Sequence, residues 1–111
     1  MDPQMKRGFV EACVLASVCG GESYGYEIIR NVPQALGLTE STLYPVLKRL
    51  ERVGQVSVRS SEHNGRPRKY YLATEAGREA LERFRAERAE VRAVYDYIET
   101  AITTDGTGRQ S

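Results

Sequence analysis

The chain has 111 residues, of which 41% are hydrophobic and 28% charged, with a formal net charge of +1 at pH 7. This length suits one small domain, and the lack of a signal peptide or an apolar run of about 18 residues predicts a cytoplasmic protein that neither crosses a membrane nor is secreted. Cys13 and Cys19 lie six residues apart on a predicted helix. They would be about 240° apart around it, so we expect reduced thiols rather than an intrachain disulfide.

Charge is unevenly distributed along the chain. Residues 1–72 contain ten Lys or Arg and seven Asp or Glu, a net charge of +3, whereas residues 73–111 contain six and eight, a net charge of −2. The total charge therefore does not by itself indicate a nucleic-acid-binding protein. The prediction of such a partner depends on where the cations cluster within the N-terminal part.

The first predicted helix covers residues 5 to 19 and ends at Gly20-Gly21. Its apolar side chains occupy more than one face, and they are Phe9, Val10, Cys13, Val14, Leu15 and Val18. A helix that is apolar nearly all round is buried on more than one side. In so small a chain, another subunit can provide part of that burial.

A short second helix is predicted for residues 24–32, with Ser23 as its N-cap. Its side chains available for packing are Tyr26, Ile28 and Ile29. Pro33 and Gly37 mark the turn that follows. This turn leads directly into a third predicted helix.

The third predicted helix runs from Thr39 to residue 53, with Thr39 or Ser41 as N-cap and Gly54 closing it. Apolar residues recur at i, i+3, i+4, i+7 and i+10 and form one stripe, Leu43, Val46, Leu47, Leu50 and Val53. The opposite side contains no acid and consists of Ser41, Tyr44, Pro45, Lys48, Arg49 and Arg52. Pro45 removes a backbone donor and should bend the start of the helix. Such a face suits the major groove of a duplex, although a solvated basic helix on a small core would show the same pattern.

Alternation between apolar and polar residues from Val56 to Arg59 predicts the first strand of a β-hairpin, and Asn64-Gly65 is a strong turn signal. Three cations lie at and just after the tip, Arg66, Arg68 and Lys69. Charged edge strands also prevent aggregation between sheets. That role does not explain why Glu62 is the only acid between residues 55 and 73. We expect this cationic ribbon to lie against the DNA backbone.

The order of helix, helix, turn, helix and hairpin predicts a winged helix-turn-helix domain over residues 1–73, in a mostly α (α+β) fold. Residues 74–102 are predicted to form one last helix, about 29 residues and roughly 43 Å long, capped by Thr74, and residues 103–111 a disordered tail. The last helix has an a/d heptad seam of Gly77, Leu81, Phe84, Arg88, Val91, Tyr95, Ile98 and Ile102. A domain of about 70 residues cannot cover so long a seam. We therefore expect a dimerisation helix, the alternative being a long helix packed only within its own chain.

Three groups of residues occur together: YGYE at 24–27, LYP at 43–45 followed by KRLE at 48–51, and RKYYL at 68–72 followed by TEAG at 74–77. In this combination, residues 5–102 resemble the PadR family of bacterial transcriptional regulators, and the single C-terminal helix is similar to that of its short members. The resemblance implies a homodimeric winged helix whose first and last helices form the dimer interface. It also implies repression of nearby genes, often for detoxification or efflux, that a small molecule relieves.

On this resemblance, the third helix would read the major groove of a pseudo-palindromic operator while the hairpin holds phosphate. The residues expected to bind double-stranded DNA are Tyr24, Tyr26, Ser41, Thr42, Tyr44, Lys48, Arg49, Arg52, Arg66, Arg68 and Lys69. The residues expected at the dimer interface are Phe9, Leu81, Phe84, Arg88, Val91, Tyr95, Ile98 and Ile102. No cofactor is expected.

A small aromatic or planar cationic effector is expected at the dimer centre, between the last helix and the first. The side chains that could line such a site are Tyr95, Tyr97, Phe9, Val10 and Cys13. Arg88 occupies a seam position where leucine would be usual, and a charge is unfavourable in a dry interface. Arg88 therefore indicates either a wet cavity that accepts a ligand or a salt bridge to Glu87 or Glu90 of the other subunit that sets the register.

The sequence gives no pattern for catalysis or metal binding. His63 is the single histidine and lies at the predicted hairpin tip without a nearby cysteine, as a solvated turn residue would. No nucleophile–base pair, phosphate-binding loop or paired acids are present, so we do not expect an enzyme. The alternative function is a protein-interaction module on a winged-helix scaffold. Lys48, Arg49 and Arg52 argue against it, because an acidic or apolar helix face would have favoured that role.

Overall fold

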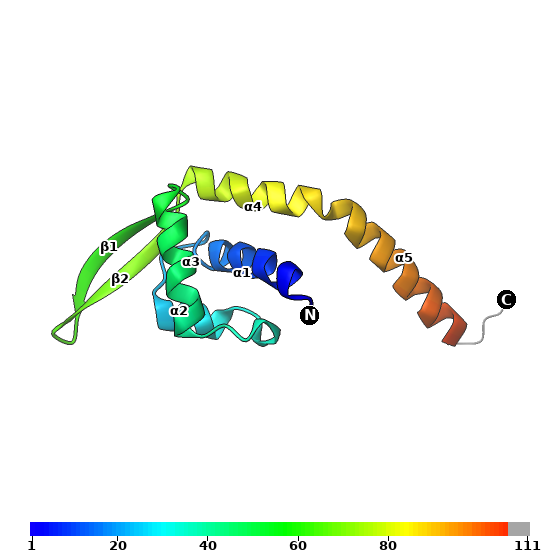
Figure 1. Ribbon diagram of the computed structural model, residues 1–111, viewed down its shortest axis with the longest axis horizontal. Helices are drawn as coiled ribbons and strands as arrows, with labels where there is room; N and C mark the ends of the chain where they lie inside the picture. The colour runs from blue at the N-terminus through cyan, green and yellow to red at the C-terminus, as the bar shows by residue number, and fades with distance from the viewer. Residues whose placement is uncertain (107–111) are drawn as a thin grey trace. The chain divides into compact units, whose positions relative to one another are not determined.

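The computed structural model describes the backbone of residues 1–106 and the side chains of residues 1–103. The elements in this range are α1 (Pro3–Ser17), α2 (Gly25–Asn31), the 3-10 turn η1 (Gln34–Leu36), α3 (Glu40–Arg52), β1 (Val56–His63), β2 (Arg66–Ala73), α4 (Glu75–Glu87) and α5 (Ala89–Gly106) (Figure 1). The chain divides into two compact units, Met1–Leu81 and the part from Glu82 onward. The first unit is the predicted winged helix-turn-helix, with α1, α2 and α3 beside a two-stranded antiparallel sheet.

The core of the first unit draws side chains from three helices and both strands. Val14, Val18, Ile28 and Leu43 have no exposed surface. The full cluster is Val10, Val14, Leu15, Val18, Ile28, Val32, Leu36, Leu38, Leu43, Leu47, Leu50, Val56, Tyr71 and Ala73. Burial of this many large aliphatic side chains, at roughly 1.5–3 kcal/mol each, is the main favourable contribution to folding.

Helix α1 begins two residues earlier than predicted because Asp2 caps it. The Asp2 carboxylate accepts hydrogen bonds from the backbone N–H groups of Gln4 (3.1 Å) and Met5 (3.0 Å), and Pro3 takes the first helical position. The helix ends at Ser17, before Gly20-Gly21. Burial on more than one face is confirmed by Val10, Ala12, Val14 and Leu15, with Phe9 and Cys13 half-buried. Both cysteines are free thiols, and burial raises the pKa of Cys13.

Ser23 does not cap α2, so that prediction is wrong. The N-cap position belongs to Tyr24, and the Ser23 hydroxyl donates a 2.5 Å hydrogen bond to the Glu27 carboxylate instead. The backbone of Ser23 pairs with Tyr71 of β2 in both directions, N–H to O at 3.0 and 2.8 Å. Ser23 is buried, and this pairing is an isolated antiparallel bridge to the hairpin.

Helix α3 begins and ends close to its predicted bounds. Thr39 occupies the N-cap position without a side-chain cap bond, because its hydroxyl lies 3.1 Å from that of Ser41. At the other end, Gly54 has a φ of 80°, and the bonds Gly54 N–H to Glu51 O (3.0 Å) and Gln55 N–H to Leu50 O (2.8 Å) form a Schellman motif. Gly54 therefore closes the helix as predicted.

The predicted apolar stripe of α3 is confirmed over most of its length. Leu43, Leu47 and Leu50 are buried and Val46 is half-buried. Val53 is an exception, since 48% of its surface is exposed. The helix ends at Arg52, so Val53 lies in the closing turn, where the helical periodicity no longer applies.

The prediction of a single uninterrupted last helix is wrong. Helix α4 ends at Glu87, and α5 starts at Ala89 and continues to Gly106, past the predicted end at Ile102 (Figure 1). At the interruption, the Arg88 N–H bonds to the Arg85 carbonyl at 3.2 Å, a tightened i to i+3 turn. Residues 103–106 of the predicted disordered tail are thus helical, and residues 107–111 lie outside the described residues.

Candidate nucleic-acid interface

The outer side of α3 presents most of the side chains that were predicted to face DNA. Ser41, Thr42, Tyr44, Lys48 and Arg52 are exposed, while Leu43, Leu47 and Leu50 turn inward. Pro45 lies within the helix and is also exposed. The helix therefore keeps its cations and hydroxyls on the surface because its apolar stripe fixes the opposite side in the core.

Arg49 differs from the other cations of α3. Its Nη2 donates to the Glu11 carboxylate of α1, so the guanidinium joins two helices of the same unit. The Arg49 side chain is 43% exposed. An exposed pair of this kind contributes little to stability. The Glu11 carboxylate nevertheless offsets the positive charge of Arg49. The outer side of α3 still presents the positive charges of Lys48 and Arg52.

The wing, residues 56–73, is a regular antiparallel hairpin. Its register pairs Val56 with Ala73 and His63 with Arg66. Asn64 (φ 54°) and Gly65 (φ 77°) both adopt left-handed backbone at the tip, as a two-residue hairpin turn requires. Arg66 and Lys69 are exposed and Arg68 is half-buried. The predicted turn at Asn64-Gly65 is therefore confirmed, and the three cations lie at and just after it.

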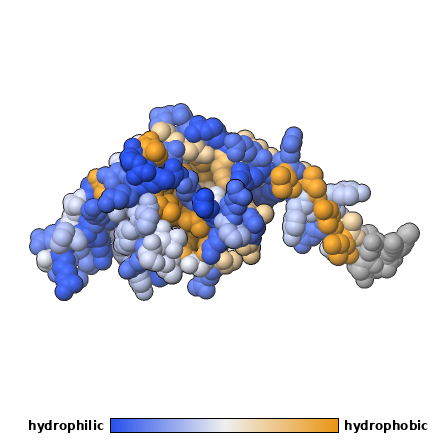
Figure 2. Space-filling view, in the orientation of Figure 1, coloured by the Kyte–Doolittle hydropathy of each residue, from blue (hydrophilic) through white to orange (hydrophobic). Residues whose placement is uncertain are grey.

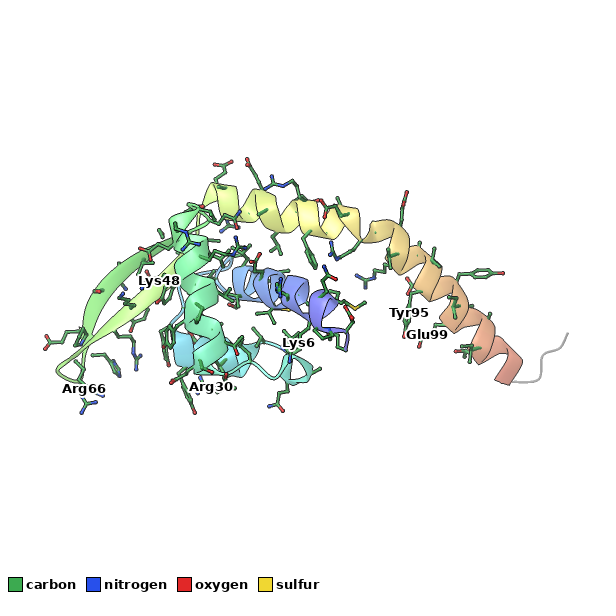
Figure 3. The ribbon with its side chains drawn as sticks, in the orientation of Figure 1. Lys6, Arg30, Lys48, Arg66, Tyr95 and Glu99 are labelled. Carbon is green, nitrogen blue, oxygen red and sulfur yellow. The ribbon has the colours of Figure 1, made fainter. Side chains whose placement is uncertain are left out.

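A groove of about 890 Å³, which we call the basic groove, lies between α2, the start of α3 and the wing. Its lining includes four cations, Arg30, Arg66, Arg68 and Lys69, and one carboxylate, Glu40. The remaining lining residues are Tyr24, Gly25, Tyr26, Tyr44, His63, Asn64, Pro67 and Tyr71. Figure 3 shows Arg30 on α2, Lys48 on α3 and Arg66 at the tip of the wing. The groove thus combines positive charge with aromatic and polar surface, which suits a polyanion with exposed ring edges.

Gly25 of the YGYE motif lies close to Tyr44 of the LYP motif, so these two sequence motifs meet in the fold. A Cβ on Gly25 would lie 2.8 Å from Cζ of Tyr44, closer than real Cβ atoms approach. The missing side chain of Gly25 on α2 therefore makes room for the phenol of Tyr44 on α3, and both residues line the groove. Burial raises the pKa of Tyr71 beside it, and the nearby Tyr44 and Glu51 raise it further.

Five side chains form a tyrosine–arginine stack along the wing. The Arg68 guanidinium lies 3.9 Å from the Tyr24 ring centroid, the Tyr24 and Tyr70 rings meet edge to face at 5.8 Å, and Arg59 lies 4.8 Å from the Tyr70 centroid. The Glu22 carboxylate accepts hydrogen bonds from Arg59 Nε (2.8 Å) and Nη2 (2.5 Å). This bidentate contact lowers the pKa of Glu22. The stack joins the wing to the segment before α2.

Sequence reasoning missed several members of this arrangement. Arg30 was not predicted to face DNA, although it lines the groove and lies 5.2 Å from the Tyr26 ring centroid. The partners Glu22 and Arg59 are 37 positions apart. Alternation along β2 places Tyr70 and Arg68 on one side of the strand, and this was the available signal for the stack.

The residues predicted for dimerisation are divided between the two units. In the first unit, Phe9 and Leu81 are half-buried. In the second, Phe84 is half-buried and Arg88 lies 3.9 Å from its ring centroid. Val91, Tyr95, Ile98 and Ile102 are 48–67% exposed. Figure 2 shows apolar surface along α5. The structure therefore gives α5 an uncovered apolar face at the predicted seam.

Gly77 is a seam residue with a different environment. A Cβ there would lie under 3.0 Å from the Gln55 carbonyl oxygen and 3.2 Å from Leu15 Cδ2. Thr74 caps α4 as predicted, since its hydroxyl accepts the Gly77 N–H at 3.1 Å and donates to Gly54 O at 2.6 Å. Gly77 thus allows the start of α4 to pack closely on the winged helix.

Neither a metal site nor a membrane span is found in the described part of the chain. Residues 1–103 contain no group of three or more His, Cys, Asp or Glu that could hold a metal ion. In the same part of the chain, no helix combines the length and apolar character needed to cross a bilayer. The exposed His63 lies at the tip of the wing, next to the groove.

Comparison with known proteins identifies the family. Residues 14–83 match the Transcriptional regulator PadR-like family. An uncharacterized protein of Lysinibacillus sphaericus is 30% identical over 95 residues, which cover 81% of this chain and 87% of that protein. A PadR-like transcription factor from Bacteroides fragilis is similar in structure, with a TM-score of 0.71, 30% identity, and coverage of 86% of this chain and 94% of the other. Bacillus subtilis PadR in complex with operator DNA has a TM-score of 0.63 and 26% identity over 68% of this chain and 46% of that one. The chain belongs to the PadR-like family of transcriptional regulators.

Proposed function

We propose that this PadR-like regulator binds a pseudo-palindromic DNA operator as a homodimer and represses transcription. The observation that carries the proposal is the basic groove, where Arg30, Arg66, Arg68 and Lys69 face a single carboxylate. Next to it, α3 exposes Lys48 and Arg52 on a helix that fits a major groove. The solved complex of Bacillus subtilis PadR with operator DNA supports the proposal by similarity.

In this proposal, α3 and the wing contact different parts of the DNA, because their side chains differ in chemistry. Ser41, Thr42 and Tyr44, at the exposed start of α3, can reach base edges with donors and acceptors. Arg66 and Lys69 on the wing can reach phosphate oxygens, which position the protein without reading sequence. Two copies related by a two-fold axis would place half-site centres about 34 Å apart, or a multiple of that distance.

The apolar face of α5 supports the homodimer. Val91, Tyr95, Ile98 and Ile102 have the spacing of a heptad seam, and each is exposed in the single chain. A second copy of α5 presents the same face, so an isologous contact would cover both. Contiguous exposed apolar surface of this kind is uncommon on monomeric proteins.

Replacing Arg66 and Arg68 with Ala tests the DNA-binding proposal. A duplex selected from a random-sequence pool by the wild-type protein serves as probe, and fluorescence anisotropy gives Kd over a range of salt concentrations. The double variant should weaken binding to all sequences similarly and flatten the salt slope by roughly one unit per lost phosphate contact. Arg85→Ala with Arg92→Ala removes the same charge from α4 and α5 and should leave the slope unchanged. A wild-type slope in the wing variant would contradict the phosphate role.

Release from DNA by a small aromatic or planar molecule bound at the dimer centre is the finer part of the proposal. Arg88 supports it, since a seam arginine disfavours a dry interface. Arg88 lies against Phe84 and within 3.4 Å of Glu87 of its own chain. Arg88→Leu should abolish induction by a compound that releases the wild type. An Arg88→Leu protein that responds normally, with an equally stable dimer, would show that Arg88 takes no part in sensing.

The alternative function, a protein-interaction module, has less support. It would require an acidic or apolar surface on α3 and the wing, but the cations of the basic groove outnumber its one carboxylate, Glu40. If the wild-type protein selects no duplex from the random pool, DNA binding is wrong and this alternative takes its place.

A further inference from the structure

Two arginines lie on the same side of the wing, and each covers a tyrosine ring. In the register of the hairpin, Arg59 is opposite Tyr70 and Arg68 is opposite Ser61, so alternation directs both arginines to one face. Arg59 lies 4.8 Å from the Tyr70 centroid and Arg68 lies 3.9 Å from the Tyr24 centroid. Both stacks place a guanidinium over a tyrosine ring, and they differ in the hydrogen bonds that the two guanidinium groups make.

The difference is in the donors at the guanidinium edges. Arg59 gives its Nε and Nη2 hydrogens to Glu22, at 2.8 and 2.5 Å, so its charge is paired within the chain. The Arg68 guanidinium has no hydrogen bond or ion pair to a residue of the described range 1–103, and it lies over the face of the Tyr24 ring. A guanidinium carries its five donors in its own plane. Stacking therefore holds Arg68 by its face and leaves its edge open to a phosphate.

Tyr24 is itself held in place by backbone and ring contacts. The adjacent Ser23 pairs with Tyr71 through two backbone hydrogen bonds of 3.0 and 2.8 Å. The Tyr24 ring meets Tyr70 edge to face at 5.8 Å with an interplanar angle of 71°. With Arg68 over one ring face, that face cannot stack on a base. Tyr24 is thus placed to orient a cation and poorly placed to read DNA.

We propose that Tyr24 is a positioning residue that acts on DNA through Arg68, because its ring holds the guanidinium with its edge toward the phosphate backbone. The inference rests on the proposed DNA binding and assigns distinct roles to residues around the groove. A long side chain that is ordered before binding loses less entropy when it contacts its ligand. This cation–π contact can raise the share of free protein that holds Arg68 ready for phosphate, and with it the affinity, by a factor of up to about two to five per wing, hence up to about four to twenty-five for a dimer.

A double-mutant cycle on Tyr24 and Arg68 tests this role, with the selected duplex as probe and anisotropy as readout. We expect Tyr24→Leu to weaken binding about four- to twenty-five-fold, and Tyr24→Phe, which keeps the ring, to stay near wild type. In the Arg68→Ala background, Tyr24→Leu should cause no further loss. Tyr26→Leu, beside Arg30, is the matched control and should add its full effect to that of Arg68→Ala.

The result that overturns the proposal is additivity, meaning an equal loss from Tyr24→Leu with and without Arg68. A loss in Tyr24→Phe as large as in Tyr24→Leu would also overturn it, because the hydroxyl would then contact DNA. Nuclear magnetic resonance of the free protein gives a readout without DNA. The Arg68 side-chain methylene protons should show an upfield ring-current shift in wild type and Tyr24→Phe, and its absence in wild type would show that the stack does not form. If the wild type selects no duplex, the proposed function fails, whereas additivity in a protein that selects one contradicts only the role of Tyr24.

Discussion

The unit Met1–Leu81 has a buried core of large apolar side chains, whereas the unit from Glu82 buries none of its own within the described residues. All fourteen residues of the buried cluster lie between Val10 and Ala73. In residues 82–103 no side chain is buried, and Val91, Val94, Tyr95, Ile98 and Ile102 are each at least 48% exposed. Both units have apolar residues at helical spacing, so the pattern alone does not distinguish a core from an interface. What distinguishes them is whether other elements of the same chain are available to cover the face.

The two units also differ in how charge is used. In the first, cations gather along the basic groove, and Arg49 and Arg59 are paired with distant acids. In the second, Arg85 pairs with Glu82 three residues before it on α4, and Arg88, at the interruption between the helices, pairs with its neighbour Glu87. An i,i+3 pair such as Glu82–Arg85 supports a solvated helix surface. In our proposal, the first unit recognises DNA and the second unit assembles the dimer.

The largest effect, on the dimer dissociation constant, should come from placing a charge on the apolar face of α5. Ile98→Asp would bury a carboxylate without a partner in the proposed dimer, at a cost of about 3 kcal/mol or more, which raises the dimer dissociation constant at least a hundred-fold. Multi-angle light scattering at several concentrations measures the change. Thr100→Asp, on the same helix away from the seam, is the control. An intact Ile98→Asp dimer would show that this face of α5 is not the interface.

A smaller effect, on stability, is expected where α4 meets the winged helix. At an exposed helical site, Gly→Ala stabilises by about 1 kcal/mol. Gly77→Ala should instead destabilise by about 1–3 kcal/mol, because its Cβ would press on the Gln55 carbonyl oxygen, a backbone atom with little freedom to move. Urea unfolding at fixed protomer concentration measures the sign. Glu79→Ala on the exposed side is the control, and a stabilised Gly77→Ala protein would disprove the close approach.

The smallest effect concerns the high-pH stability of the first unit. Burial raises the pKa of Tyr71 above its usual value of 10.0. Above about pH 10 the unfolded chain therefore loses this proton before the folded chain does, and the free energy of unfolding falls as pH rises through the folded pKa. Tyr71→Phe should remove part of that fall, while Tyr97→Phe, at an exposed position of α5, should not. Identical profiles for Tyr71→Phe and wild type between pH 9 and 11 would contradict this.

Local rules predicted much of the fold. The stripe of α3, its closure at Gly54, the turn at Asn64-Gly65 and the Thr74 cap each depend on residues close in sequence, and the structure confirms them. Ser23 was mispredicted because its pairing with Tyr71, far along the chain, overrides its capping preference. The interruption at Arg88 has no local signal, since neither Gly nor Pro occurs between residues 78 and 105.

The candidate site was only partly predictable for the same reason. Cation positions on α3 and the wing follow from periodicity, so most residues expected to face DNA are exposed as predicted. The side chains that pair with or stack on those cations could not be predicted from the spacing of residues in the sequence. Glu11 pairs with Arg49 across 38 positions and Glu22 with Arg59 across 37. Such contacts arise only when helices and strands pack, which is where the distinction between Arg59 and Arg68 originates.

The most direct test of the account is hydroxyl-radical footprinting of the wild-type protein on its selected duplex, with light scattering of the complex to count subunits. Two copies that each present α3 and a wing should protect two segments on one face of the duplex, centred about 34 Å apart or a multiple of it. The complex should contain two subunits per duplex. A single protected segment bound by one subunit, or no protection at all, would contradict the proposal that this regulator reads DNA as a dimer through the basic groove.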